Sequence, residues 1–447
     1  MTQQLTKPSF AKQKEEDLFQ ELRKHVNETV KHFGPARQKT IYIKALLFPL
    51  LYLASYALAL IFSQNLFVFY LLYFLMGVFL VLNYLNIVHE AIHNTLFRSN
   101  ALNKLYIHLF DVMGANSYIF KIRHVRFHHN YPNVMGWDTD FEQSSLARIF
   151  PHGRFSSIHK YQHIYLPFIY PLYLFNWLLI RDFKDFYKKN TTVKKLVSAI
   201  PFTEHIKLFL FKIFFFFYLV VFPVLLYGVS YSQTFTGFLI MMFTASIFSL
   251  TVLLAPHASL ESKYPMPDEK GHIPTSWLVH QLSCTNDVEN DNWFVRFFMG
   301  SFNYHVAHHL FPYINHIYYP EVTKVIKSFA RQHKLPYRSF SLATSLKNHY
   351  LLLKRNAFHE NIFEDIHIVA VGFHHGLRAR QGNQTVERVL RSDSRIVSGH
   401  QQGLRQTVEG QNRRHAQHRA IAQRLRQTGA GGDRWLGSGR GDARARV

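Results

Sequence analysis

Long apolar stretches alternate with charged and polar segments along this chain of 447 residues. Four of the stretches are long enough to cross the hydrocarbon core of a bilayer, which takes about 20 helical residues. They lie at residues 41–62, 66–88, 208–229 and 233–255. Only a few polar or small residues separate the first two stretches, and the same holds for the last two. The pattern therefore predicts two transmembrane hairpins, and the alternative is four buried helices of a large soluble protein.

Lys and Arg are distributed unevenly around these hairpins. Neither hairpin turn contains either residue, whereas the segments before residue 41, at 89–207 and after 256 are rich in both. Because positive segments are retained in the cytosol, we expect a multi-pass integral membrane protein with both termini cytosolic. Residues 1–40 form an amphipathic segment without the apolar core of a cleavable signal peptide. Residues 164–180 are apolar but contain two prolines, so we expect them to be interfacial or re-entrant and not a fifth span.

Composition adds three points. The formal net charge of +23 is explained by basic loops lying against anionic headgroups, so we expect no nucleic-acid partner. The single cysteine, Cys284, excludes an intrachain disulfide and fits a reducing cytosolic face. Residues 1–356 hold 24 Lys and 12 Arg, whereas residues 357–447 hold no Lys and 15 Arg. We interpret this last segment as a disordered tail that derives from a frameshift or a mis-assembled gene.

Eight histidines form three tight clusters, each close to an apolar stretch. They are His89 and His93 in HEAIH, His124, His128 and His129 in HVRFHH, and His305, His308 and His309 in HVAHH. Imidazole is the commonest side-chain metal ligand, and eight exceed the four ligands that one zinc takes. The clusters therefore predict a site for two metal ions at the membrane surface, although any single histidine can instead cap a helix or lie in a core.

The spacing within the clusters indicates how the ions are shared. Residues i and i+4 lie on one helix face, so His89 with His93, and His124 with His128, can each hold one ion. Neighbouring histidines point about 100° apart on a helix, so one member of a pair can serve each ion. Imidazole suits iron, zinc, copper and nickel alike. Two ions at a membrane face, held by neutral nitrogens, suit iron, dioxygen and the oxidation of unactivated C–H bonds.

Two other classes of protein compete with an oxidase. HEAIH fits the HExxH motif of zinc proteases, in which Glu90 would be the general base. That hypothesis leaves the other six clustered histidines without a role. A metal carrier would place its ligands within the spans, near the middle of the membrane, whereas these histidines lie outside the spans.

The stretches around the clusters resemble the membrane fatty acid desaturases with three histidine boxes, and among these the acyl-CoA or linoleoyl-CoA, "front-end" type. The resemblance covers most of residues 40–340 and includes HEAIHNTLF, FKIRHVRFHHNYPNVMGWDTD, SWLVHQLSCTND and FNYHVAHHLFPYINHIYYPEV. It implies an all-α protein with four transmembrane helices in two hairpins and a cytosolic helical di-iron cap, within residues 41–356. It also implies that the eight box histidines, together with His257 after the fourth span, are catalytic ligands of two irons.

The activity implied by the resemblance is O2-dependent insertion of a cis double bond into a fatty acyl chain, carried by coenzyme A or by a lipid. The chain would thread an apolar tunnel from the cytosolic face. Electrons would come from a separate ferredoxin or cytochrome b5, because the sequence lacks the HPGG motif of a fused cytochrome b5. A hydroxylase would use the same site. Front-end members usually have Gln where this chain has His305, which leaves the position of the double bond open.

Polar residues beside the boxes are candidates for supporting roles. Asp138 and Asp140 follow the second box and can accept hydrogen bonds from ligand N–H groups, or they can form a turn. Asn303 can bond a metal-bound water or belong to a turn. Glu90 can orient a ligand or face solvent.

Overall fold

The computed structural model describes residues 6–11, 15–33, 37–141 and 144–358. Its first unit, Met1–Glu360, contains all of them. The segment expected to be a disordered tail, residues 357–447, lies outside the described residues from position 359 onward. Regular structure in the described part of the chain is almost entirely helical, in agreement with the all-α prediction.

The helices follow one another with short connections. The first half of the described chain contains α1 (Glu15–Lys31), α2 (Gln38–Ile61), α3 (Leu66–Asn83), α4 (His89–Ile92), α5 (Asn100–Val112), α6 (Ser117–Lys121), α7 (Gln162–Ile169), α8 (Tyr173–Phe175) and α9 (Asp182–Tyr187). The second half contains α10 (Phe202–Phe216), α11 (Phe222–Tyr227), α12 (Tyr231–His257), α13 (Trp277–Cys284), α14 (Trp293–Phe297), α15 (His305–Leu310), α16 (Tyr319–Gln332) and α17 (Leu342–Arg355).

Shorter elements complete the fold. Within the described residues, π-helical segments lie at Tyr84–Val88, Ile122–His128, Asn176–Arg181 and Phe217–Val221. Segments of 3₁₀ helix lie at Ser157–Tyr161, Tyr170–Leu172, Thr192–Lys195 and His316–Tyr318. Two parallel strand pairs join distant parts of the chain: β1 (Ser9–Phe10) with β2 (His272–Ile273), and β3 (Asp287–Val288) with β4 (Ser339–Phe340).

In the part of the chain that the structure describes, five helical stretches are long and apolar enough to cross a membrane, one more than the four expected. They are Gln38–Ile61, Leu66–Ile92, Ser157–Lys195, Phe202–Tyr227 and Tyr231–His257. The four expected spans all lie among them. The additional stretch is not one continuous α-helix, because it is built from short α, 3₁₀ and π pieces. Pro167 lies inside α7, and Pro171 lies in the 3₁₀ piece Tyr170–Leu172.

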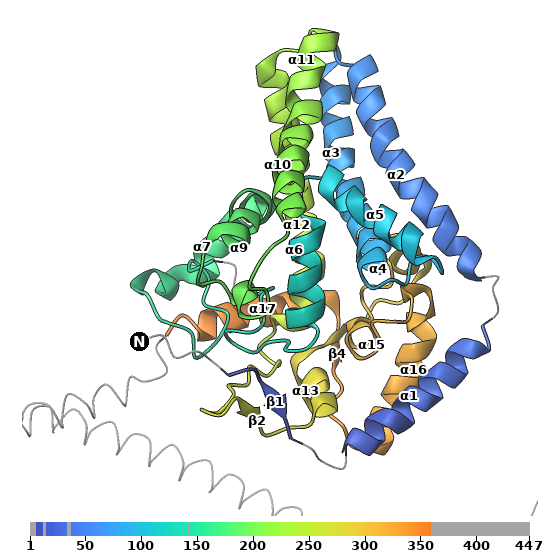
Figure 1. Ribbon diagram of the computed structural model, residues 1–447, viewed down its shortest axis with the longest axis vertical. Coiled ribbons are helices and arrows are strands. Elements are labelled where there is room, and N and C mark those ends of the chain that lie inside the picture. The colour runs from blue at the N-terminus through green and yellow to red at the C-terminus, as the bar shows by residue number, and fades with distance from the viewer. Residues whose placement is uncertain (1–5, 12–14, 34–36, 142–143, 359–447) are drawn as a thin grey trace, which may run out of the picture. The chain divides into compact units, whose positions relative to one another are not determined.

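The hairpin turns carry helix caps, and the spans pack closely. Asn65 accepts a hydrogen bond from the Val68 N–H at the start of α3, and Ser230 does the same for Gln233 in α12. Helix α3 lies between α2 and α12 (Figure 1). At Gly77 a Cβ atom would lie 2.5 Å from the Met241 carbonyl oxygen, so only glycine permits this approach of α3 to α12.

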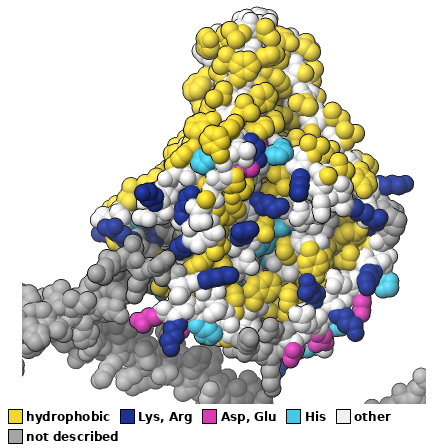
Figure 2. All heavy atoms as spheres, in the orientation of Figure 1, with side chains coloured by type: hydrophobic (Ala, Val, Ile, Leu, Met, Phe, Trp, Pro, Cys, Tyr) yellow, Lys and Arg dark blue, Asp and Glu magenta, His cyan; other side chains and the backbone are white. Residues whose placement is uncertain are grey.

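The histidine clusters lie where the spans meet a second group of helices. Leu22 and Val26 of α1 pack in one core cluster with Val322 and Ile326 of α16, and the two helices lie side by side in Figure 1. Figure 2 shows the spans covered with hydrophobic side chains, while Lys and Arg gather over the rest of this face. The apolar surface and the basic surface therefore separate along the molecule as the sequence predicts.

Candidate metal centre

The local backbone around the first two histidine boxes is π-helical. The segment Tyr84–Val88 continues α3 and leads into His89, while Ile122–His128 carries His124 and His128. A π-helix is closed by bonds between residues five apart, and the His129 N–H accordingly donates to the His124 carbonyl at 3.0 Å. These turns set which histidines face one another. His257 is the last residue of α12, and α15 carries the third box.

The structure brings all nine histidines together in one place. Their ring nitrogens form two sets of four, in each of which one atom per residue lies within 4.8 Å of the other three: His89, His93, His124 and His308, and His128, His257, His305 and His309. The Nε2 atom of His89 lies 3.1 Å from the Nε2 atoms of His124 and His308. In the second set, the Nε2 atoms of His257 and His305 lie 2.7 Å apart.

The ninth histidine, His129, lies between the two sets. It forms a group with His308 and His309, one from each set, and its Nε2 lies 3.1 Å from that of His124. Adjacent histidines of the third box serve different sets, as expected. His124 and His128, expected to share one ion, fall into different sets of four histidines, but together with Asp140 they form a further group whose atoms lie within 4.8 Å of one another.

The protonation state of most of these imidazole rings suits metal binding. Eight of the nine side chains are buried and His93 is half-buried. Burial lowers the pKa of His124 to about 4, and burial together with neighbouring histidines holds the pKa of His308 and His309 well below 6.5. Neutral imidazole is the form that binds metal. Among the described residues, His93 Nε2 and His309 Nε2 are buried without a hydrogen-bond partner, which suits ligand atoms that face an ion.

Several ligands are oriented from behind through Nδ1. His128 donates to Asp138 Oδ1 at 3.0 Å, and His124 donates to Asp140 Oδ2 at 3.4 Å. The two carboxylates outweigh the effect of burial and raise the pKa of His128. Asp138 is itself fixed by the N–H groups of Asn133 and Asp140. Both aspartates thus occupy the supporting positions that the sequence suggested, and such contacts fix the ring orientation and the tautomer.

Two supporting residues were not predicted from the sequence. His309 Nδ1 lies 3.2 Å from Gln281 Oε1, and the Gln281 amide donates to the His129 carbonyl at 2.9 Å. His308 Nδ1 lies 3.2 Å from the Tyr319 hydroxyl. Gln281 is 24 residues from the third box, and no local spacing signals this contact. Asn303 turns its amide toward the backbone carbonyl of Val288, and its own carbonyl accepts from Val288 N–H, which favours a role in the turn.

Glu90 is buried and does not face solvent. Its Oε1 lies 3.3 Å from His316 Nδ1 and 3.9 Å from His89 Nδ1, while Oε2 accepts from the Thr95 hydroxyl. The Lys44 ammonium lies behind them, 2.9 Å from His316 Nε2. Glu90 therefore approaches the back of His89, opposite the nitrogen that faces the other histidines. A protease base would have to approach the metal side, so this geometry disfavours the zinc protease hypothesis.

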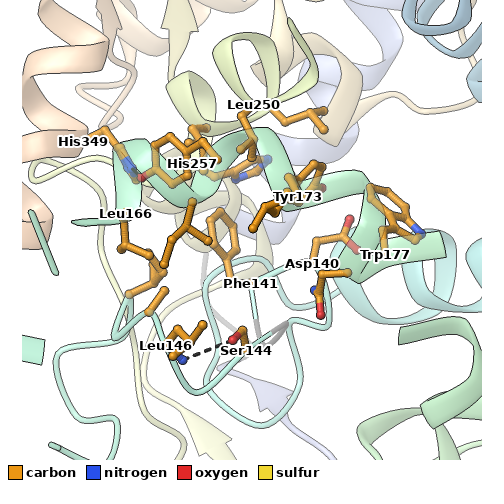
Figure 3. A pocket seen from close by; sticks show the side chains of 18 of the residues that line it. Asp140, Phe141, Ser144, Leu146, Leu166, Tyr173, Trp177, Leu250, His257 and His349 are labelled. Atoms are coloured by element: carbon orange, nitrogen blue, oxygen red, sulfur yellow. Dashed lines mark hydrogen bonds between the residues drawn. The ribbon is translucent and has the colours of Figure 1, made fainter. Parts of the chain in front are cut away.

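An apolar cavity of about 500 Å³ opens onto the histidines. His124, His128, His257 and His305 form part of its lining. Figure 3 shows Leu250 and His257 of α12 on one side, with Phe141, Tyr173 and Leu146 around the same space. Apolar cavities with a few convergent polar groups are the usual form of ligand sites, and this one suits a hydrocarbon chain.

Comparison with known proteins agrees with the geometry. The family described as fatty acid desaturase matches residues 64–341 of the chain. An sn-1 linoleoyl-lipid 6-desaturase of Arthrospira platensis is 28% identical over 56% of this chain and 68% of its own length. An acyl-lipid (8-3)-desaturase of Physcomitrium patens is 25% identical over 77% of this chain and 73% of its own length. A delta(5) fatty acid desaturase A of Dictyostelium discoideum is 29% identical, with shares of 72% and 69%.

Proposed function

Because the chain belongs to the fatty acid desaturase family, we propose that it is a di-iron enzyme that inserts a cis double bond into a fatty acyl chain. The main support for the proposal is that histidines of both sets line an apolar cavity. The nine histidines would hold two irons. Two irons held there would activate dioxygen, which with two electrons, two protons and the two hydrogens removed from adjacent carbons would be reduced to two waters.

The protein's own residues would place the chain and exclude water. Phe141, Tyr173 and Phe302 line the cavity beside the histidines, so the hydrocarbon would lie against ring faces next to the metal centre. The supporting contacts of Asp138, Gln281 and Tyr319 would keep the rings from turning when electrons arrive. A rigid, largely dry site favours hydrogen removal from one pair of carbons, because only that pair lies near the ions.

The proposal also includes the electron donor and the side of the membrane on which the metal centre lies. Electrons would come from a separate ferredoxin or cytochrome b5. The distribution of Lys and Arg supports a cytosolic metal centre and cytosolic termini. The curated relatives carry names of lipid-linked as well as unspecified fatty acid desaturases.

The test is expression of the full chain in a host that lacks polyunsaturated lipids, followed by gas chromatography of its fatty acids. The expected result is a new double bond in a chain that the host already makes or in linoleate supplied to the culture. A His308→Ala variant is the control and should give no product. A hydroxy fatty acid in place of the alkene would identify a hydroxylase, and the absence of any modified chain in iron-loaded cells would overturn the proposal.

A further inference from the structure

The cavity beside the metal centre reaches the molecular surface at an apolar rim. Leu146, Leu172 and Ile180 line the cavity and are also 40%, 48% and 55% exposed. A side chain that is on the lining and on the surface marks the place where the two meet. Ser144 is the other exposed lining residue, and its hydroxyl accepts a hydrogen bond from the Leu146 N–H (Figure 3). The opening is therefore bordered mainly by hydrocarbon.

This rim lies on a surface suited to lipid. Leu172 and Ile180 belong to the stretch Ser157–Lys195, which is apolar enough to be a membrane span. Its outer side also carries Ile164 and Phe168, which are 55% and 80% exposed and do not line the cavity. Exposed apolar side chains gathered in this way mark a surface that contacts lipid or another apolar partner. Across the cavity the wall is α12, itself a candidate span.

Basic residues are missing from the cavity lining. The described lining contains no Lys or Arg, and its only carboxylate is Asp140, which is engaged with His124. Coenzyme A carries a diphosphate and a further phosphate, which proteins bind with Lys, Arg or helix N-termini. Arg148 lies between two lining residues, but its guanidinium donates to the backbone carbonyls of Gly153, Asn356 and Phe358. Among the described residues, the rim thus offers no Lys or Arg to a polyanionic carrier.

The polar groups deeper in the wall are occupied by one another. The Tyr170 hydroxyl donates to His349 Nε2 at 2.6 Å, and His349 Nδ1 donates to the Ala258 carbonyl at 2.9 Å. Both residues line the cavity. With these bonds made, rings and aliphatic side chains form most of the surface presented to a guest, and Asn176 adds a polar side chain beside them. A surface of this kind suits a methylene chain.

Resting on the proposed function, we propose that the acyl chain enters sideways from the bilayer between Leu146, Leu172 and Ile180, so that the substrate is a chain still attached to a membrane lipid and not an acyl-CoA. A cytosolic tunnel mouth, expected from the family resemblance, would need a polar rim. The lateral rim lets the headgroup stay at the membrane surface while the chain alone bends into the protein.

The first experiment offers two substrates that cannot exchange carriers. Membranes containing the full chain and its electron donors receive a phospholipid with an ether-linked linoleyl chain, or a thioether analogue of linoleoyl-CoA. The expected result is a new double bond in the ether lipid alone. Conversion of the coenzyme A analogue, alone or with the lipid, would overturn the lateral inference and leave the desaturase intact. Conversion of neither those analogues nor any ordinary acyl substrate by iron-loaded protein would instead overturn the proposed function.

A pair of matched variants tests the rim itself. Ile180→Lys places a charge at the opening, whereas Ile164→Lys places the same charge in the same stretch at equal exposure away from the cavity. We expect Ile180→Lys to lower conversion of the ether lipid roughly tenfold or more, because an ammonium opposes passage of hydrocarbon. Ile164→Lys should match the parent. Equal activity of the two variants, at equal iron content, would contradict the proposed entrance.

The location of the rim can be measured without activity. Cys284 is the chain's one cysteine and is buried, so Ile180→Cys introduces a unique site for a nitroxide spin label. In vesicles, a label at 180 should collide with lipid-soluble oxygen more than with a water-soluble nickel chelate. A label at Gln332→Cys, on an exposed position at the end of α16, should show the opposite ratio. A water-exposed label at 180 would overturn the inference even if Ile180→Lys failed to fold.

Discussion

At the scale of single residues, the metal centre depends on side chains that hold the histidines from behind. Gln281 contacts two of them, accepting from His309 Nδ1 and donating to the His129 carbonyl. We expect Gln281→Leu to weaken iron binding about 10–100-fold, the usual effect of losing such a contact. Chelator titration with metal analysis measures it. Gln281→Glu keeps the acceptor and should retain more iron, and full retention by the Leu variant would contradict this role.

A second residue-scale prediction concerns a buried charge. The Lys44 ammonium lies 3.0 Å from Asn86 Oδ1 and 2.9 Å from His316 Nε2, and His316 in turn contacts Glu90. Lys44 and Glu90 are not in contact but are joined through His316. Removing Lys44 leaves the Glu90 carboxylate buried with less compensation, and a loss of this kind costs up to about 3–5 kcal/mol in a direct buried pair. Lys44→Met should therefore lower the unfolding temperature in detergent markedly. The double variant Lys44→Met with Glu90→Gln should recover part of the loss, and additive losses would contradict the coupling.

The sequence could identify the clustered histidines and two of the carboxylates behind them, but not the other side chains that contact them. Nine histidines were singled out by their spacing and by resemblance, and the structure gathers all nine. Asp138 and Asp140 could also be predicted, because they follow the second box closely in the sequence. Gln281, Tyr319 and His316 reach their partners only through tertiary packing, so no local pattern marks them.

At the scale of elements, the close approach of α3 to α12 yields a prediction. A Cβ atom at Gly77 would meet Met241 O and the Thr244 side chain at 2.5 and 2.9 Å. We expect Gly77→Val to destabilise the protein by about 1–3 kcal/mol through overpacking, measured as a fall in unfolding temperature. Phe74→Leu, at an exposed position one turn earlier, should have little effect. Equal stability of both variants would show that the spans can separate without cost.

Apolar length alone predicted four stretches that overlap candidate spans of the structure, with ends that differ by up to six residues, but two features did not follow from it. The stretch expected to be interfacial, residues 164–180, belongs to a longer candidate span, Ser157–Lys195, built of short pieces. Its prolines were visible, yet the α, 3₁₀ and π pieces between them depend on packing. The π-helical turn at Ile122–His128 could not be predicted either, because such a turn differs from an α-helical one by about one residue and no residue type in the sequence marks it. That turn carries His124 and His128, which fall into different sets.

At the scale of the whole molecule, the cavity is assembled from segments that are distant in sequence, and residues near the end of the described chain close it. The Gln162 amide donates to the Leu353 carbonyl, and Asn356 donates to the Ile149 carbonyl. With the bond between Tyr170 and His349, these contacts tie α17 to the segments that line the cavity. The sequence placed residues up to 356 in one domain, but no pattern in it indicates that α17 closes the cavity.

This arrangement predicts where the chain can be shortened. All nine histidines, the cavity lining and the family match at residues 64–341 precede residue 358. A chain ending at Phe358 should bind the same iron and form the same product as the full chain. A chain ending at Phe340 lacks α17, so we expect it to retain the histidines but lose desaturation, since the wall at Ile149, Gln162 and Tyr170 loses its partners. Iron analysis and gas chromatography on both chains check this, and loss of product in the longer one would assign a role to the Arg-rich segment.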